Sequence, residues 1–288
     1  MTTATAPAQS PSPTSTNVHL SALGLLRSEW IKLRTVRSTI WCYALIILLT
    51  IGIGVLVSSL ATLPTATTTG DAARSLTVTA ATGGINLAVL IVSILGTLII
   101  TGEYATGMIR STFTADPRRL GAIVAKMVIL AVTAFITSGI AIWLNALIVW
   151  PILHHRGVDV QLGDPSVFMP LLGGSVFVTL ISLLAFGFGL ILRSTAGGLA
   201  TVLGLLLVAP IILGILTGLT HADWVGDLRA IFPDSAGGQL VSYATPGSKT
   251  GIVNGILTLN GWLGFWVMLG WDAVVLTVAS VLVKRRDA

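Results

Sequence analysis

Charged residues are scarce in this sequence of 288 residues. Only 9% of the residues are Asp, Glu, Lys or Arg, whereas an average soluble domain is about a quarter charged. Hydrophobic residues make up 54%, more than a core surrounded by a water-facing surface needs. The composition therefore predicts an integral membrane protein. A net charge of +5 could indicate a nucleic-acid ligand, but the cations flank apolar runs, so we expect membrane orientation and no nucleic acid.

The sequence also has few groups that carry chemistry. The single cysteine, Cys42, excludes a disulfide within the chain and a cysteine-based metal site. No Gly-x-x-x-x-Gly-Lys-Ser/Thr stretch occurs, so the chain has no loop of the kind that cradles ATP phosphates. A membrane enzyme would need clustered carboxylates or a Ser/His pair, and neither is evident. His154, His155 and His221 lie near one predicted membrane face, but adjacent interfacial histidines are usually only hydrated, so we predict no metal site.

Six stretches are long enough to cross a bilayer, for which a helix needs about 20 mostly apolar residues. Backbone polar groups cannot stay unpaired in lipid, so each stretch is predicted to be a helix, and the fold class is all-α. The stretches cover 38–70 (with the span ending near residue 60), 75–102, 127–153, 165–192, 194–222 and about 263–283.

The N-terminal residues 1–19 are rich in Pro, Ser and Thr and lack the basic-then-apolar order of a cleaved signal peptide. We expect a disordered cytoplasmic tail over 1–19, followed by one transmembrane domain over 20–288.

Lys and Arg are distributed unevenly between the two sides of the predicted spans. All but four of the 16 lie on one side; the exceptions are Arg74, Arg156, Arg229 and Lys249. Cytoplasmic loops carry an excess of these residues, so the basic side is predicted to be cytoplasmic, with both termini inside the plasma membrane.

A basic segment, 20–37, precedes the first span. Leu23, Leu26, Trp30 and Leu33 recur in it at spacings of three and four, which forms one apolar stripe on a helix. Such a helix lies in the membrane interface with its cations near anionic headgroups. The alternative is a simple positive flank of the first span; the stripe favours the amphipathic interfacial helix.

The loop between the second and third spans has a pattern of its own. A short helix from Glu103 places Glu103, Gly107 and Arg110 on one face and Tyr104 and Met108 toward another. This pattern is typical of a helix presented to a partner in the cytosol. From the loop alone, an ordinary loop whose charges only anchor the topology is an equal alternative.

Four local features, in this order, resemble the permease subunit of type-2 ABC transporters, especially the small six-span permeases of actinobacterial exporters. SEWIKLRTVRS (28–38) resembles their amphipathic elbow, and GEYATGMIRSTF (102–113) resembles their coupling helix. FPDSAGGQL (232–240) resembles their last external loop, and KRRDA (284–288) resembles their basic-acidic tail. The resemblance spans roughly 21–288.

The resemblance implies a transport subunit that is not itself an enzyme. Two permease copies would work with two copies of a separate ATPase subunit, which holds ATP and Mg, while this chain holds no cofactor. The segment 223–260 would form an external loop with short re-entrant helices. Export, such as efflux of drugs or antibiotics, is implied, but the cargo is not. The residues implied to contact the ATPase are those of a coupling helix over 103–113: Glu103, Tyr104, Gly107, Met108, Ile109, Arg110 and Phe113.

The resemblance also implies that the second and fifth spans line a central cavity between the two copies. Asn86, Ser93 and Thr97 share one face of the second span, and Thr201 and Gly204 share a face of the fifth, which Pro210 can kink. Small and hydroxyl residues also hold helices together in lipid. We therefore expect packing for most of these residues and a cavity role for one or two.

Asp272 is the only acid well inside a predicted span. A charge at that depth costs roughly 2.5 to 3.5 kcal/mol on insertion scales. The acid could serve an ion-coupled secondary transporter, which is the alternative function. Such proteins usually show embedded charges and internal repeats, and no repeat is visible here. We therefore expect a structural role for Asp272; a polytopic membrane enzyme is the least favoured function.

Overall fold

The computed structural model describes residues 22–61, 70–115, 120–220, 222–245, 247–253 and 256–285. The predicted tail 1–19 and the final residues 286–288 lie outside the described residues. Within those ranges the chain is almost entirely helical, with one two-stranded sheet. Six helical stretches are long and apolar enough to span a membrane, so the predicted all-α, multi-pass membrane class is confirmed. They are Arg37–Leu60, Gly70–Thr106, Leu120–His155, Pro165–Leu192, Thr195–Thr220 and Gly261–Arg285.

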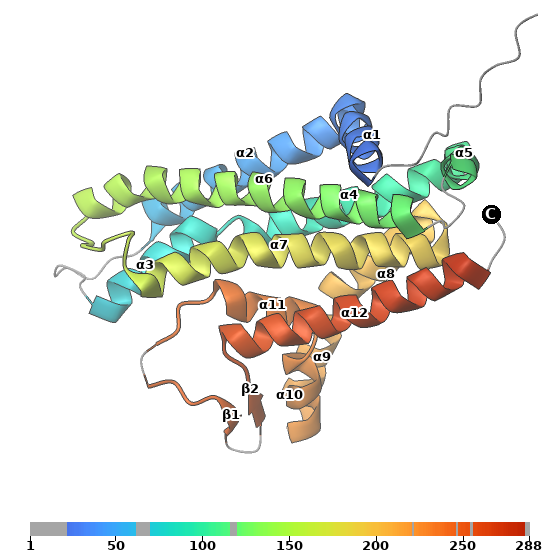
Figure 1. The fold of residues 1–288 in the computed structure, drawn as a ribbon. Helices are drawn as coiled ribbons and strands as arrows, with labels where there is room; N and C mark the ends of the chain where they lie inside the picture. Colours follow the sequence, from blue (N-terminus) through green and yellow to red (C-terminus); the bar gives the residue numbers. More distant parts are fainter. Residues whose placement is uncertain are drawn as a thin grey trace, which may run out of the picture.

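The bundle is built around α7 (Pro165–Leu192), the most buried span, which packs against α4, α6 and α12. Figure 1 shows these helices and α2 running side by side. We call one end of the bundle the α5 end, because α1, α5 and the C-terminal end of α12 lie there; the opposite end is the α3 end. The helices named here are α1 (Ala22–Thr35), α2 (Arg37–Leu60), α3 (Gly70–Thr82), α4 (Ile85–Thr106), α5 (Met108–Ala115), α6 (Leu120–His155) and α12 (Gly261–Arg285).

The second predicted span is not one continuous helix, because it breaks between α3 and α4. A Cβ at Gly84 would lie 2.4 Å from the Cα atom of Thr50, so only glycine permits this approach of α2. The amide of Asn145 on α6 donates hydrogen bonds to the carbonyls of Ala80 and Ala81, at 2.7–3.1 Å. The carbonyl of Ala80 also accepts a longer hydrogen bond from the backbone N–H of Gly83, at 3.5 Å, so the Asn145 amide adds shorter bonds at this helix end. The break is therefore stabilised by the two helices that surround it.

The fifth span changes its winding halfway. It begins as α8 (Thr195–Leu203), continues as a π-helical turn, η1 (Gly204–Val208), and ends as α9 (Ala209–Thr220). The irregular turn comes shortly before Pro210, which cannot donate a backbone hydrogen bond to the preceding turn. The predicted kink at Pro210 stays a prediction; the structure shows a π-helical turn that ends two residues before this proline. In Figure 1, α9 lies beside α10 (Asp223–Ala230), outside the main bundle.

The segment 223–260, in which the resemblance implies short helices, contains α10, α11 (Pro233–Val241) and a hairpin of β1 (Gly251–Val253) and β2 (Ile256–Thr258). The helix α11 is pressed against α7 and α12. A Cβ at Gly173 or Gly264 would come within 2.3 Å of an α11 carbonyl oxygen. Glycines on both neighbours therefore let α11 sit directly against the bundle.

A polar network ties the α3 end together. The Arg74 guanidinium of α3 contacts the carboxylate of Asp164 at 2.8 Å and that of Asp71 at 3.2 Å. The hydroxyl of Tyr243, which follows α11, donates to Asp71 at 2.7 Å. Asp164 caps α7: the backbone N–H of Ser166 donates to its carboxylate, and this bond holds the pKa of Asp164 below its ordinary value. The network fixes α3 and the α11 segment to the start of α7.

Candidate functional site

Four charged side chains meet inside the protein at the α5 end. Glu29 and Lys32 come from α1, Glu103 from the last turn of α4, and Lys126 from the start of α6. The Lys126 ammonium donates to Glu103 Oε1 at 2.8 Å and also to Glu29. The Lys32 ammonium donates to Glu29 at 2.7 Å and to Glu103 Oε1 at 3.1 Å. We call these four residues the charge cluster.

The charge cluster is buried and electrically balanced. Glu29, Glu103 and Lys126 are each no more than 7% exposed, and two carboxylates face two ammonium groups. Burial lowers the pKa of Lys32, but its hydrogen bond to Glu29 and the attraction of Glu103 outweigh burial, so its pKa lies above the ordinary value of lysine. The ion pairs of the charge cluster join α1, α4 and α6 and lie mostly out of water.

The helix length places this cluster near a membrane boundary. With 36 residues, α6 is about 54 Å long, well over the roughly 30 Å of a bilayer core. Its first turns, which include Lys126, can therefore lie outside the hydrocarbon. The predicted third span began just after Lys126, in agreement with this position.

The prediction of one continuous helix over 103–113 is wrong. Glu103 belongs to α4, which continues to Thr106, and a new helix, α5, begins at Met108. Between them Gly107 adopts a left-handed conformation with φ of 72°, which ends helices readily when the residue is glycine. Glu103 therefore points into the charge cluster and does not share an outward face with Gly107 and Arg110.

Two of the predicted coupling residues anchor this segment to the bundle. Tyr104 is half-buried, and the Arg193 guanidinium at the end of α7 lies 5.2 Å from the centre of its ring. Ile109 is buried in a core cluster with Ile123 of α6 and Phe186 of α7. Movement of α5 would therefore pull on several spans.

Other predicted coupling residues face outward. Gly107, Met108 and Arg110 are exposed, and the Met108 side chain keeps 47% of its surface accessible. The backbone of Phe113 belongs to α5, but its side chain lies outside the described residues. The apolar Met108 and the basic Arg110 are thus both exposed on α5, at the end of the bundle where α1 also lies (Figure 1).

The elbow segment forms α1, two residues shorter at each end than the predicted 20–37 helix, and residues 20–21 lie outside the described part. Within the predicted stripe, Leu23 and Trp30 are exposed, whereas Leu26 and Leu33 are half-buried. The most deeply buried side chain of the described α1 residues is Glu29, which faces α6. The face that α1 turns toward the protein is therefore centred on a charge.

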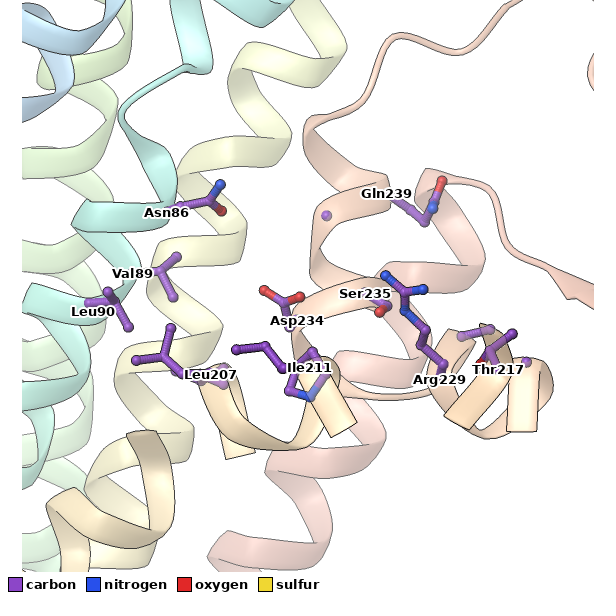
Figure 2. A pocket seen from close by; sticks show the side chains of 15 residues that line it. Asn86, Val89, Leu90, Leu207, Ile211, Thr217, Arg229, Asp234, Ser235 and Gln239 are labelled. Carbon is purple, nitrogen blue, oxygen red and sulfur yellow. The ribbon is translucent and has the colours of Figure 1, made fainter. Parts of the chain in front are cut away.

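A second feature is a cavity of about 840 Å³ bounded by α4, the fifth span, α10 and α11, shown in Figure 2. Its apolar wall includes Val89, Leu90, Leu207 and Ile211; its polar wall includes Asn86, Thr217, Arg229, Asp234, Ser235 and Gln239. The second and fifth spans therefore do line one cavity within a single copy.

Of the predicted cavity residues, Asn86 lines this cavity. Ser93 and Thr97 do not, because they are fully buried; the Thr97 hydroxyl donates to the carbonyl of Ser93 at 2.9 Å and lies 3.4 Å from that of Ala185 on α7. Thr97 therefore lies against α7, whereas the buried Ser93 hydroxyl donates to the carbonyl of Leu90 on its own helix. Thr201 is exposed and Gly204 is half-buried, and neither belongs to the described wall of the cavity.

The cavity contains two opposite charges that sequence reasoning did not single out. Arg229 of α10 and Asp234 of α11 both line it, and no ion pair joins them in the described part of the chain. Burial raises the pKa of Asp234 above its ordinary value, although Arg229 partly opposes this effect. Figure 2 shows the two side chains on different helices. They offer separate contacts for a cation and an anion.

Asp272 lies in the middle of α12 and is only 4% exposed. Neither of its carboxyl oxygens has a hydrogen-bond partner among the described residues. No hydrogen bond that would support the expected structural role of Asp272 is found in that part of the chain. Charged carboxylates are costly at such a position unless they are paired.

The sequence predicts no metal site at His154, His155 and His221, the three histidines near one membrane face. The ring of His154 stacks on that of Trp150, with centroids 5.7 Å apart, and His155 is exposed. His221 lies outside the described residues. Over the ranges that the structure describes, no three His, Cys, Asp or Glu side chains are grouped to hold a metal ion.

Sequence reasoning missed Glu29 and Lys126 as members of a site. The available signals were weak: Glu29 is the only acid in a basic helix, and Lys126 borders an apolar run. A basic residue at a span end is usually explained by membrane orientation alone. Only the packing of α1 on α6 shows that these charges are paired.

Comparison with models of known protein families, and with curated protein sequences, finds no match for this chain.

Proposed function

We propose that this chain is the membrane-spanning subunit of an ATP-driven exporter. Two copies would form the translocation path and work with two copies of a separate ATPase subunit that binds ATP and Mg. The observation that carries this proposal is the construction of α5. This short surface helix follows α4 after one left-handed glycine, and the last turn of α4 is held by the charge cluster. A force applied to α5 by a partner would pass to α1, α4 and α6 together.

The charge distribution supports a matching orientation. Arg34, Arg37, Arg110 and Lys284 are exposed at the α5 end, and by the positive-inside rule they support a cytoplasmic location of this end, with both termini inside. The exposed Leu23 and Trp30 of α1 would then contact the inner interface of the plasma membrane. The cavity between α4 and the fifth span would lie toward the outer side, on the path of the cargo. An ATPase that docks on α5 would be on the side where ATP is available.

The test is a charge reversal on the exposed face of α5. We expect Arg110→Glu to weaken co-purification of the proposed ATPase subunit by about tenfold or more, because truncating or opposing an interfacial charge costs about 2–5 kcal/mol when it is desolvated. The matched control is Arg27→Glu, an exposed arginine on α1. Full ATPase association by Arg110→Glu, or equal loss in both variants, would show that α5 is not the docking helix.

Asp272 is the observation that favours the alternative function, an ion-coupled secondary transporter. Its buried carboxyl group is without a partner in the described chain and could bind and release a proton. Transport measured in vesicles that contain the purified chain separates the two functions. An ATP-driven exporter moves its cargo only with the ATPase and ATP, whereas a secondary transporter moves it with an imposed proton gradient alone and loses this movement in Asp272→Asn.

A further inference from the structure

The cavity of about 840 Å³ between α4, the fifth span, α10 and α11 has a wall of polar side chains without internal partners. None of the five takes part in a hydrogen bond or an ion pair with a described residue. The Thr217 hydroxyl, in the same wall, differs, because it donates to the carbonyl of Leu213 at 2.7 Å. The five side chains are Asn86, Arg229, Asp234, Ser235 and Gln239.

The polar atoms of these five side chains can be reached by a ligand. Asn86 and Arg229 are exposed, and the three residues of α11 are half-buried. Side-chain nitrogen and oxygen atoms that are both buried and unpaired occur at several places in the described chain, but none belongs to these five residues. Figure 2 shows Asp234 between Asn86, on the side of α4, and Arg229, on the side of α10. Their donors and acceptors are therefore open to water and to a bound molecule.

Two opposite charges lie in this wall without pairing to each other. No ion pair joins Arg229 and Asp234 in the described part of the chain. The Arg229 guanidinium lies beside α9 instead, because a Cβ at Gly214 would be 3.7 Å from one of its nitrogens. A ligand that covers the wall removes water from both charges, and each charge is costly to cover without a counter-charge. A ligand with an ammonium group and an anionic group compensates both.

The opposite wall of the cavity is apolar. It is formed by Val89 and Leu90 of α4 and by Leu206, Leu207 and Ile211 of the fifth span. The volume falls in the range of about 300–1,000 Å³ that is usual for small-molecule sites. An alkyl chain covers such a wall favourably, because it removes apolar surface from water. The cavity therefore combines an apolar side with a side that carries one positive and one negative charge.

We propose that this cavity binds a zwitterionic amphiphile, whose head carries a primary ammonium group and a phosphate or carboxylate group. The ammonium donates hydrogen bonds to the Asp234 carboxylate, the anionic group accepts them from Arg229, and the chain lies against the apolar wall. The amide and hydroxyl side chains of the wall bond to the rest of the head. The role of this molecule as cargo rests on the export function proposed above, whereas its binding requires no ATPase.

The first experiment compares three ligands on the unmodified full-length chain without an ATPase. The chain is placed in nanodiscs of phosphatidylcholine, whose quaternary ammonium has no hydrogen-bond donor. The probes are dodecylphosphoethanolamine, dodecyl phosphate and dodecylammonium, which share one chain and differ in the charge of the head. Affinities are compared at equal mole fraction in the bilayer, so that partition into lipid cancels. We expect the zwitterion to bind at least about tenfold more tightly than either singly charged probe. Equal binding of the three would overturn the proposal.

The second experiment removes one charge at a time. We expect Asp234→Asn to weaken binding of dodecylphosphoethanolamine at least about tenfold and to leave dodecyl phosphate unaffected. We expect Arg229→Gln to weaken binding of the zwitterion and of dodecyl phosphate, but not of dodecylammonium. The control is Asp223→Asn, an exposed acid of α10 outside the cavity wall, which should change none of the three.

A merely structural role of either charge gives a different result. A variant that distorts the cavity weakens all three probes alike, and this outcome in both Asp234→Asn and Arg229→Gln would contradict the proposal. Neither side chain bonds to a described residue, so we expect both variants to fold. The comparison of ligands on the unmodified chain decides the question if a variant does not fold.

Native mass spectrometry distinguishes the sources of the ligand. If the occupant is a membrane lipid, the chain purified from cells carries a lipid with an ethanolamine head that Asp234→Asn loses and Asp223→Asn keeps. If the ligand comes from elsewhere, the purified chain carries none and binds only the added dodecylphosphoethanolamine. Retention of an anionic lipid in preference to a zwitterionic one would contradict the proposal.

The site and the export function can fail separately. Selective binding of the zwitterion, together with ATPase association that is unchanged in Arg110→Glu, would support the site and remove the support for the docking of an ATPase on α5. Loss of ATPase association in Arg110→Glu, together with equal binding of the three probes, would support the export function and overturn the ligand.

Discussion

Lys126 shows how one residue can have a different role from the one its position in the sequence indicates. A lysine at the start of a span usually indicates the orientation of that span in the membrane. In the structure Lys126 is only 5% exposed, and its ammonium donates to Glu29 and Glu103. Glu103 likewise differs from its predicted role. It was predicted to contact the ATPase, but its carboxylate is buried in the charge cluster. A Glu103→Ala variant would therefore test folding together with any contact to an ATPase.

A prediction about stability follows from the buried ion pairs. We expect Lys126→Met to lower the free energy of unfolding by about 3–5 kcal/mol, because it leaves two buried carboxylates with one ammonium group. Equilibrium unfolding of the purified chain in mixed micelles measures this loss. Lys284→Met is the control, since Lys284 is exposed at the same end of the bundle. An equal, small effect of both substitutions would show that the charge cluster contributes little to stability.

At the scale of elements, the break between α3 and α4 is the clearest departure from a simple spanning helix. It combines a glycine that allows α2 to approach with an asparagine that pairs the freed carbonyls. Neither residue alone explains the break. Gly84 provides space, and Asn145 supplies two donors that lipid cannot supply.

The close approach at Gly84 leads to a prediction for this element. We expect Gly84→Ala to destabilise the protein by about 1–3 kcal/mol, because its Cβ would meet backbone atoms of α2 that cannot rotate away. Gly52→Ala is a suitable comparison, since a Cβ there meets no atom within 4 Å. Thermal unfolding of the two variants in the same detergent measures the difference. If Gly84→Ala is as stable as Gly52→Ala, α2 is not packed against the break as the structure shows.

At the scale of the whole molecule, the two ends of the bundle differ in charge and in construction. The α5 end carries α1, α5 and exposed cations, and the α3 end carries the polar network, whereas α10 lies to one side of the bundle (Figure 1). We expect the α5 end to face the cytoplasm. This orientation is a prediction that labelling in cells can decide.

The labelling experiment uses single cysteines in a Cys42→Ala background. Ser248→Cys lies at an exposed position after α11, and Ser28→Cys at an exposed position of α1. We expect a membrane-impermeant maleimide to label only Ser248→Cys in intact cells and both variants in permeabilised cells, because the positive end stays inside. Labelling of Ser28→Cys from outside would reverse the proposed orientation.

The class of the protein could be predicted from the sequence because it depends on local properties. Runs of about 20 apolar residues must become helices in lipid whatever surrounds them, so six spans were predicted and are present. A kink at Pro210 could be predicted for a similar reason, because the missing N–H belongs to the residue itself.

The contacts between helices were decided only by the tertiary structure. Ser93 and Thr97 have the face periodicity of cavity residues, yet both are fully buried and Thr97 lies against α7, because a helical face does not specify which neighbour will cover it. In the same way, the spacing from Glu103 to Arg110 predicted one helical face, but Gly107 ended the helix and the packing of α1 on α6 drew Glu103 inward. Pairing of charges separated by up to 97 residues depends on which helices meet, and this information is not contained in any local pattern.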